Sequence, residues 1–355
     1  MTYRVCLVFF KPSPLTYAAV NGRPNILALS SDAELSEIRI RPFLSALLAR
    51  GIIASYQFAD RKMSPIGWLR TVQFSHIWCQ RNVSTAQFRF LKKHAHVPII
   101  YDIDDLLTDV PEFVMKRRSR TIDRIDWCLK HAKAVTVATA PLKRGLQDSV
   151  SASASITVLK NGFTGWQSPR WPELKKRIVW TSGDLPFVLR DNPDFINGVA
   201  NLATRHNYEM IFIGRFDPDY RKLFEPHRHI QRLDFASYRE FLHSNAGAIA
   251  LAPLPSGLPE PVQRFFDAKS DIKLIDYLTA GLVPVCTSTP PYAKSEFFIP
   301  ELAAPDPKGL LQVLEKCITN HAAMIELVDR TVYESNLLKA REFTELSKLL
   351  DPIFE

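Results

Sequence analysis

The sequence lacks the features that mark several common protein classes. Its five cysteines, Cys6, Cys79, Cys128, Cys286 and Cys317, are scattered and form no C-x-x-C pair. This pattern argues against a disulfide framework or a zinc site and favours a reducing cytoplasm. No apolar run approaches the roughly 18–20 residues that a membrane span needs. The first residues, MTYRVCLVFFKPSP, lack the long apolar region of a cleavable signal, so we expect VCLVFF to be a buried strand.

Several catalytic motifs are also missing. The sequence contains no G-x-x-x-x-G-K-[ST], no G-x-G-x-x-G after the first apolar run and no G-x-S-x-G. These absences argue against a P-loop ATPase, a dinucleotide oxidoreductase and a hydrolase with a nucleophile elbow. No pair of histidines has the spacing of a zinc site. We therefore expect no zinc site and no resident cofactor.

The chain is long enough for two domains, and its charge is unevenly distributed between them. It has 355 residues, of which 46% are hydrophobic and 23% charged, as in globular proteins. Residues 1–172 contain 24 Lys and Arg against 12 Asp and Glu, a net charge of +12, so the total of +8 leaves −4 for residues 173–355. A basic first half could contact anionic lipid, a diphosphate-lipid acceptor or nucleic acid, or could simply be a basic soluble surface.

Apolar runs of strand length alternate with helix-period runs along the whole chain. We expect strands at 3–10, 52–58, 75–79, 97–102, 133–138, 155–159, 177–182, 208–213, 246–252 and 282–287. We expect helices at 34–50, 84–94, 110–131, 139–147, 190–205, 237–244, 271–280, 307–319, 321–333 and 335–350. This alternation predicts the α/β class, with two Rossmann-like domains that face a cleft. The aperiodic segment 161–176, rich in Gly, Pro and Trp, marks the joint between them.

The segment 265–287, FFDAKSDIKLIDYLTAGLVPVCT, carries the most informative pattern. Ser270 is a residue type that caps helix starts, a helical run follows, and a glycine precedes the strand-like LVPVCT. Lys269 and Lys273 flank the helix start, where free N–H groups suit an anion such as a diphosphate. Asp276 lies three residues after Lys273, on the same helix face. This surface could bind a nucleotide sugar; on spacing alone, an amphipathic helix with a solvated ion pair explains it as well.

Three carboxylates follow the strand-like run VPIIY, at a strand end where ligands of open α/β sheets bind. Asp102, Asp104 and Asp105 could accept hydrogen bonds from sugar hydroxyls, take a proton from an acceptor or hold a cation. Alternatively, one or two of them cap the next segment.

Other polar residues follow strands of the second half. RIVWTSGDLP ends a strand with Ser182 and Gly183, and Gly183 would let a ligand approach the backbone, although a lone glycine is more often a turn. IFIGRFD ends with Arg215, which could reach a phosphate. The loop after VPVCT carries Tyr292.

Taken together, these segments resemble the GT-B glycosyltransferases, most closely the retaining family-4 group. DIKLIDYLTAGLVPV resembles the signature helix and strand of that group, and VPIIYDIDDLL resembles a strand-end segment of its bacterial polysaccharide transferases. ITVLKNGF, with Asn161, resembles the segment that closes the first domain. The resemblance implies an acceptor-binding domain at 1–172, a nucleotide-sugar-binding domain at 173–334 and a C-terminal segment, 335–355, whose helix returns to the first domain.

The resemblance also assigns roles to residues. Asp276 falls on the second signature glutamate of the group, which binds the nucleotide ribose, whereas the first signature glutamate falls on Ala268 and is lost. The expected donor site comprises Asp276, Lys273, Ser270, Lys269, Gly183, Ser182 and Arg215. The expected catalytic carboxylates are Asp104 and Asp105, followed by Asp102. Tyr292 and Asn161 are expected at the acceptor side or in the cleft.

The implied activity is transfer of a hexose or deoxyhexose from a nucleotide diphosphate sugar to a glycan or diphosphate-lipid-linked glycan. It would proceed with retention, without a metal, in polysaccharide biosynthesis, in the cytoplasm and at the inner face of the membrane if the basic half binds lipid. Loss of the first glutamate leaves open a catalytically inactive GT-B-like binding subunit. The basic half leaves open a nucleic-acid binder or base-modifying transferase, but the aromatic residues among its basic ones have the spacing of a core, which argues against nucleic acid.

Overall fold

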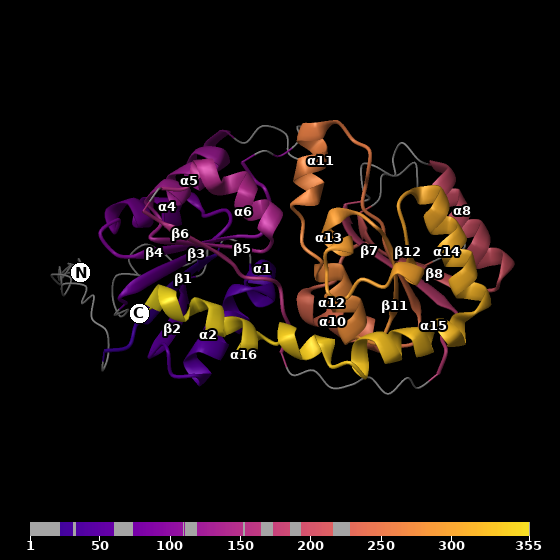
Figure 1. Ribbon diagram of the computed structural model, residues 1–355. Coiled ribbons are helices and arrows are strands. Elements are labelled where there is room, and N and C mark those ends of the chain that lie inside the picture. Colours follow the sequence, from indigo (N-terminus) through magenta and orange to yellow (C-terminus); the bar gives the residue numbers. More distant parts are fainter. Residues whose placement is uncertain are drawn as a thin grey trace, which may run out of the picture.

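The computed structural model contains two parallel sheets in two lobes, and the C-terminal segment runs along both of them (Figure 1). The structure describes residues 22–30, 33–59, 74–108, 110, 119–151, 153–164, 173–184, 193–215 and 228–354. The expected α/β class is confirmed. Within the described ranges, no helix is both long and apolar enough to cross a membrane.

The first sheet has six strands in the order β2-β1-β3-β4-β5-β6, and every pair is parallel. Its strands are β1 (Asn25–Ser30), β2 (Ser55–Ala59), β3 (His76–Gln80), β4 (Ile99–Ile103), β5 (Ala134–Val137) and β6 (Ser155–Val158). The helices of this half are α1 (Ala33–Ile38), α2 (Ile40–Ala49), α4 (Thr85–Lys93), α5 (Ser119–His131) and α6 (Ala140–Leu146), followed by the turn η1 (Gln147–Ser149).

The second sheet also has six parallel strands, in the order β12-β11-β10-β7-β8-β9. Its strands are β7 (Arg177–Asp184), β8 (Glu209–Arg215), β9 (Arg228–Ile230), β10 (Ile249–Ala252), β11 (Val283–Thr287) and β12 (Ala303–Ala304). The helices are α8 (Pro193–Arg205), α10 (Phe235–Ser244), α11 (Glu260–Asp267), α12 (Ile272–Thr279), α13 (Pro290–Ala293), η3 (Pro300–Leu302), α14 (Pro307–Thr319) and α15 (His321–Val328). This is the doubly wound arrangement, in which the order of the strands across the sheet reverses between β7 and β10.

Both faces of the central strands of the first sheet are buried, so β1, β4 and β5 are buried at almost every position, whereas the edge strand β2 alternates between exposed and partly buried residues. Leu27 and Leu29 of β1 belong to one core, which α4, α5 and α6 cover. Ile26 and Ala28 belong to the opposite core, which α2 and the C-terminal segment cover. The second domain is built around one larger core that includes Trp180.

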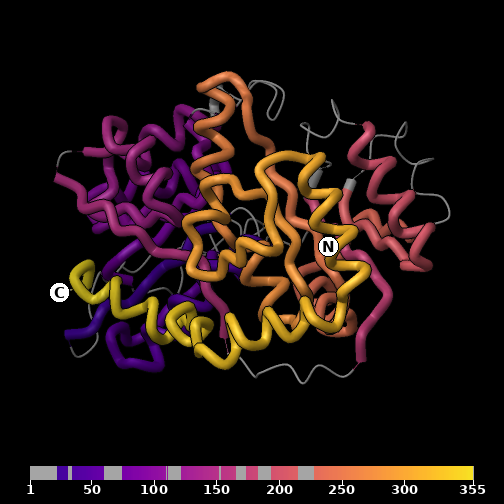
Figure 2. Tube along the Cα trace, turned by 45° about the vertical axis from the view of Figure 1, so that its right-hand side comes forward, coloured from indigo at the N-terminus to yellow at the C-terminus, as the bar shows by residue number. Residues whose placement is uncertain are grey.

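The C-terminal segment returns to the first domain, as expected. After α15 it continues as η4 (Asp329–Tyr333), η5 (Leu337–Arg341), α16 (Phe343–Leu346), η6 (Ser347–Leu350) and α17 (Asp351–Phe354). The ring of Phe343 meets that of Phe43 in α2 edge-on at 4.7 Å. Arg50 of α2 forms an ion pair with Asp351 at 2.6 Å. Figure 2 shows this segment, in yellow, running along one side of both lobes.

The expected helix at 335–350 is wrong in its form, because the segment is a series of short helical turns rather than one helix. The expected helix at 34–50 is also broken, at Arg39. Pro42 explains this break, since proline has no N–H to donate to the carbonyl of Ile38.

Several elements of the structure were not expected, β1 and α11 among them. The first described strand is β1, at Asn25–Ser30, whereas the expected strand 3–10 lies outside the described residues. Helix α11 occupies Glu260–Asp267, where neither a helix nor a strand was expected, and it stands between the two lobes in Figure 1.

Candidate functional site

The strand order locates the crevice of each sheet. In the first sheet the order reverses between β1 and β3, and in the second between β7 and β10. Ligands of open α/β sheets bind outside the carboxyl ends of the strands at such points. The residues that follow these strands, and helix α12, therefore form the candidate site.

Helix α12 directs two charged side chains toward this region. The Lys273 ammonium donates hydrogen bonds to two oxygens of Thr181 in β7. One is the backbone carbonyl, and the other is the side-chain hydroxyl, at 3.1 Å. The Tyr238 hydroxyl donates to the carboxylate of Asp276 at 3.3 Å. Burial raises the pKa of Asp276 to about 6, against the effect of the neighbouring Lys273, and burial lowers the pKa of Lys273 to about 8. Both groups are thus mainly charged at pH 7.

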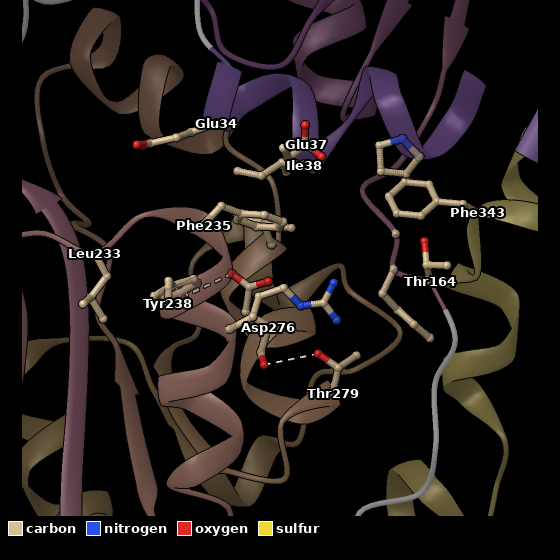
Figure 3. Close-up of a pocket in the computed structure, with 15 residues that line it drawn as sticks. Glu34, Glu37, Ile38, Thr164, Leu233, Phe235, Tyr238, Asp276, Thr279 and Phe343 are labelled. Atoms are coloured by element: carbon tan, nitrogen blue, oxygen red, sulfur yellow. Dashed lines mark hydrogen bonds between the residues drawn. The ribbon is translucent and has the colours of Figure 1, made fainter. Parts of the chain in front are cut away.

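Asp276 also lines a cavity of about 210 Å³ between the two domains (Figure 3). The wall from the second domain contains α12 and α10, with Phe235 and Tyr238 beside Asp276. The opposite wall comes from helix α1, with Glu34 and Glu37. The cavity is lined by carboxylates, aromatic rings and Arg239, which together suit the hydroxyls, the base and a phosphate of a nucleotide.

Ser270 does not cap α12, contrary to expectation. The residue before the helix is Asp271, whose side chain makes no capping bond and instead forms an ion pair with Arg341 at 2.6 Å. Ser270 accepts a hydrogen bond from the side-chain amide of Asn161 at 2.8 Å. Helix propensity alone could not reveal this, because the competing partners come from distant parts of the chain.

Asp102 lies at the end of β4 and is fully committed to protein partners. Its two oxygens accept from Arg39 at 2.7 and 2.9 Å, and Thr136 donates to it at 2.7 Å. The side chains of Asp102 and Arg39 are each only 1% exposed. This carboxylate therefore has a structural role in the first domain, where it fixes Arg39.

Asp104 and Asp105 form a charge cluster that spans both domains. Arg81, at the end of β3, contacts Asp104 at 2.9 Å and Asp105 at 2.5 Å, and Lys269 of the second domain contacts Asp105 at 3.0 Å. Burial raises the pKa of Asp104 despite the nearby Arg81. Burial alone would also raise the pKa of Asp105, but Lys269 and Arg81 outweigh it and hold that pKa below its usual range. Asp105 thus stays an anion, whereas Asp104 is the more easily protonated.

Helix α11 closes one side of the cleft against the first domain. Phe265 and Phe266 pack into the core of the first domain, together with Ala268. The hydroxyl of Thr139, which caps α6, donates to the carbonyl of Ala268 at 2.9 Å. Ala268, the position of the missing glutamate, is therefore buried between the domains.

Of the other residues predicted for the site, those whose side chains the structure describes do not line the cavity. Ser182 and Gly183 lie in the last, irregular part of β7, and Gly214 passes so close to the Ser182 carbonyl that a Cβ there would meet it. Arg215 ends β8, and its side chain lies outside the described residues. Tyr292 does not line the cleft, since it is 1% exposed in the core of the second domain. Asn161 is buried at the crossing between the domains.

Sequence reasoning missed three residues of this region. Arg81 adopts a left-handed backbone conformation with φ of 45°, which is uncommon outside glycine and occurs at functional sites. Arg39 and Arg341 are buried charges, each held by carboxylates. A basic residue directly after a strand was a usable signal for Arg81, whereas no local pattern distinguishes Arg39 or Arg341 from surface arginines.

Comparison with known proteins supports the fold. No protein-family model matches the sequence, and no curated protein is significantly similar to it. Sucrose-phosphate synthase (tll1590) from Thermosynechococcus elongatus superposes with a TM-score of 0.61 at 12% identity, over 94% of this chain and 98% of that one. Anabaena Alr3699/HepE, solved in complex with UDP-glucose, gives 0.57 at 13% identity over 93% and 99% of the two chains. Trehalose-6-phosphate from E. coli bound with UDP-2-fluoro glucose gives 0.53 at 11% identity over 93% and 98%.

These structures share two Rossmann-like domains around a cleft, and the chain therefore has the GT-B fold. The GT-B fold expected from the sequence is confirmed. At such low identities the similarity establishes the fold alone, so activity has to be argued from the residues of the site.

Proposed function

We propose that this protein is a glycosyltransferase that transfers a sugar from a nucleotide diphosphate sugar to a glycan or lipid-linked glycan. The observation that carries the proposal is the position of Asp276 and Lys273 on α12, beside a cavity between two GT-B domains. A carboxylate can accept hydrogen bonds from the ribose hydroxyls, and an ammonium can bind the diphosphate. Two structurally similar proteins were solved with UDP-glucose or UDP-2-fluoro glucose, so UDP-sugars are the first donors to test.

The main chemical task in this reaction is to stabilise the diphosphate as it leaves. Lys273 is suited to this, because its ammonium lies beside Thr181 of β7, on the same helix as Asp276. Lys269 is a second cation at the same edge of the cleft. We propose that these two side chains provide the charge stabilisation without a metal ion.

The first domain would bind the acceptor and provide the carboxylates that face the reacting sugar. Asp105 is held as an anion by Lys269 and Arg81, so it can stabilise positive charge that develops on the sugar ring. Asp104 has a raised pKa and is the better candidate for a hydrogen bond with the acceptor hydroxyl. In a retaining reaction the leaving phosphate would take the proton of that hydroxyl. A role in polysaccharide biosynthesis and contact of the basic half with an anionic membrane surface complete the proposal.

Thermal stabilisation by nucleotides tests the donor site, since a ligand that binds only the folded state raises the Tm. UDP, GDP, CDP, ADP and their sugar conjugates would be compared for the wild type, D276A and D276N. We expect one nucleotide family to raise the Tm, D276A to abolish the shift and D276N to reduce it. E326A, on the exposed surface of α15 in the same domain, is the control and should keep the full shift. Absence of a shift with every nucleotide, in a folded sample, would contradict the proposal.

A catalytically inactive nucleotide-sugar-binding subunit is the second candidate. It is favoured by Ala268, which replaces the carboxylate of the resembled group and is buried against Thr139. Mass spectrometry of reaction mixtures separates the candidates. A bound nucleotide sugar that is neither transferred to any acceptor in a glycan and lipid-glycan panel nor hydrolysed would favour the inactive subunit.

A further inference from the structure

We infer that Asn161 is a positioning residue that sets the separation of the two walls of the donor cavity. Asn161 lies where the chain crosses from the first domain to the second, and it is 3% exposed. The inference rests on the proposed donor site for its functional meaning, whereas its structural content can be tested without any ligand.

The side chain of Asn161 connects the two domains directly. Its amide oxygen accepts from the Arg39 guanidinium at 2.6 Å, and its amide nitrogen donates to the Ser270 hydroxyl at 2.8 Å. Arg39 is in turn fixed by both oxygens of Asp102. We call this chain of contacts, Asp102–Arg39–Asn161–Ser270, the Asn161 bridge.

Each end of the Asn161 bridge reaches one wall of the cavity. Arg39 is the residue between α1 and α2, and α1 contributes Glu34 and Glu37 to the first wall. Ser270 lies two residues before α12, which contributes Asp276 to the second wall. A shift at either contact of the amide would therefore change the distance between the groups that face the cavity.

The backbone around Asn161 is held equally closely. Arg341 of the C-terminal segment donates to the Asn161 carbonyl at 2.8 Å. At the next residue, Gly162, a Cβ would lie 2.4 Å from the Arg341 carbonyl oxygen. The side-chain amide of Asn161 thus projects from a fixed backbone. Its two hydrogen bonds can therefore fix the positions of Arg39 and Ser270 relative to each other.

The ion pair between Lys269 and Asp105 is a second polar connection between the domains, and it is more accessible to water than the Asn161 bridge. The side chains of Lys269 and Asp105 are 29% and 22% exposed, so a bound diphosphate or solvent can replace their contact. The Asn161 bridge is desolvated at Asn161 and Arg39, and an unpaired amide there is costly. Of these two polar connections, the buried one is the better suited to hold a single arrangement.

The test measures the distance between the domains directly. Spin labels would be attached to cysteines introduced by R89C in α4 and K316C in α14, both exposed positions, in the full chain with C6S. The four described cysteines are buried and should not react. Double electron–electron resonance would compare the distance distributions of the parent, N161A, S270A and the double variant.

N245A is the matched control. Asn245 is also buried, at 2% exposed, accepts from an arginine, Arg177, at 3.0 Å and donates to the Phe241 carbonyl at 2.8 Å, but all these contacts lie within the second domain. It should lower stability and leave the distance distribution unchanged. We expect N161A and S270A to broaden or shift the distribution, and the double variant to resemble N161A because both changes break one chain of contacts.

Two results would overturn the inference: N161A and S270A distributions that match the parent, or an equal change in N245A. If N161A does not fold, the distance distribution of S270A, which removes only a hydroxyl, decides whether the inference holds. Where nucleotide binding is present, we expect N161A to weaken it about tenfold and N245A to leave it near the parent value. If the parent binds no nucleotide, the proposed function fails, but the distance comparison still decides whether the Asn161 bridge holds the domains.

Discussion

Gly162 should tolerate no side chain, because the C-terminal segment passes directly over it. A Cβ built at this position lies 2.4 Å from the Arg341 carbonyl oxygen and 2.8 Å from Leu346 Cδ1. A backbone oxygen cannot rotate away as a flexible side chain can. In G162A, either the crossing or the C-terminal segment therefore has to move by several tenths of an ångström.

The cost of that movement can be estimated from the contacts it affects. Overpacking a close contact costs about 1–3 kcal/mol. Two hydrogen bonds hold the segment to the crossing, from Phe163 N–H to the Arg341 carbonyl at 3.1 Å and from Phe343 N–H to the Phe163 carbonyl at 3.0 Å. Weakening both, without losing either, adds roughly 0.5–1.5 kcal/mol in all. We expect local opening of this contact to become easier by about 2–4 kcal/mol in total.

Hydrogen–deuterium exchange measured by mass spectrometry gives a direct readout of this contact. Peptides that contain Phe163 and Phe343 should exchange roughly 30-fold to several hundred-fold faster in G162A, if exchange follows the opening equilibrium. G145A is the control, since its Cβ would meet only the end of the Leu106 side chain, at 3.0 Å, and alanine favours the helix. Unchanged protection of both peptides in a folded G162A protein would refute the reasoning.

Three further predictions follow from the buried charges. The pKa of Asp276, raised by burial to about 6, means that the folded state binds the proton more tightly than the unfolded state, so stability falls as the pH rises from about 4 to 6. Urea unfolding should find D276N more stable than the wild type at pH 7.5, by on the order of 1 kcal/mol, with no difference at pH 4. Burial opposes ionisation of Glu296, but Arg341 outweighs it and lowers that pKa to about 2, so its stabilisation should be lost on acidification from about pH 5 to 2. R341L should lack this acid-dependent loss and should unfold more easily at pH 7, by about 3–5 kcal/mol, whereas equal acid sensitivity in both proteins would contradict the pairing. Removing Arg81 leaves Asp104, whose side chain is only 16% exposed, without its ion-pair partner. R81A should therefore lose stability by about 2–4 kcal/mol at pH 7 and recover part of it at pH 4, as thermal unfolding at the two pH values can check.

The order of the regular elements was largely predictable, because it depends on local periodicity. The strands β3, β4 and β5 match short apolar runs, and α4 begins at a reciprocal cap between Ser84 and Gln87, as its sequence pattern allows. β1 was missed because VCLVFF is the more continuous apolar run, whereas NILALS begins with Asn25 and ends with Ser30. Only the pairing of Ile26 with Tyr56 on one side and with His76 on the other identifies the second run as a central strand.

The candidate site was predictable in part, for a similar reason. Lys273 and Asp276 share a helix face by spacing alone, and the structure places that face at the cavity and the end of β7. Ser270 and Asn161 were chosen as ligand-binding residues, and the structure instead pairs them with each other. Their side chains are 109 residues apart in sequence, and no local pattern encodes a contact at that separation.

The sequence by itself thus determined the α/β class, the two domains' alternation of strands and helices, and the polar residues that follow strands. These depend on backbone propensity and on side-chain period, which act over a few residues. Only the tertiary structure decided which charges are buried, since Arg39 and Arg341 find their carboxylates on other elements. It also decided that α11 closes one side of the cleft over Ala268 and that Asn161 joins the walls of the cavity, because burial and hydrogen-bond geometry arise only when distant segments pack together.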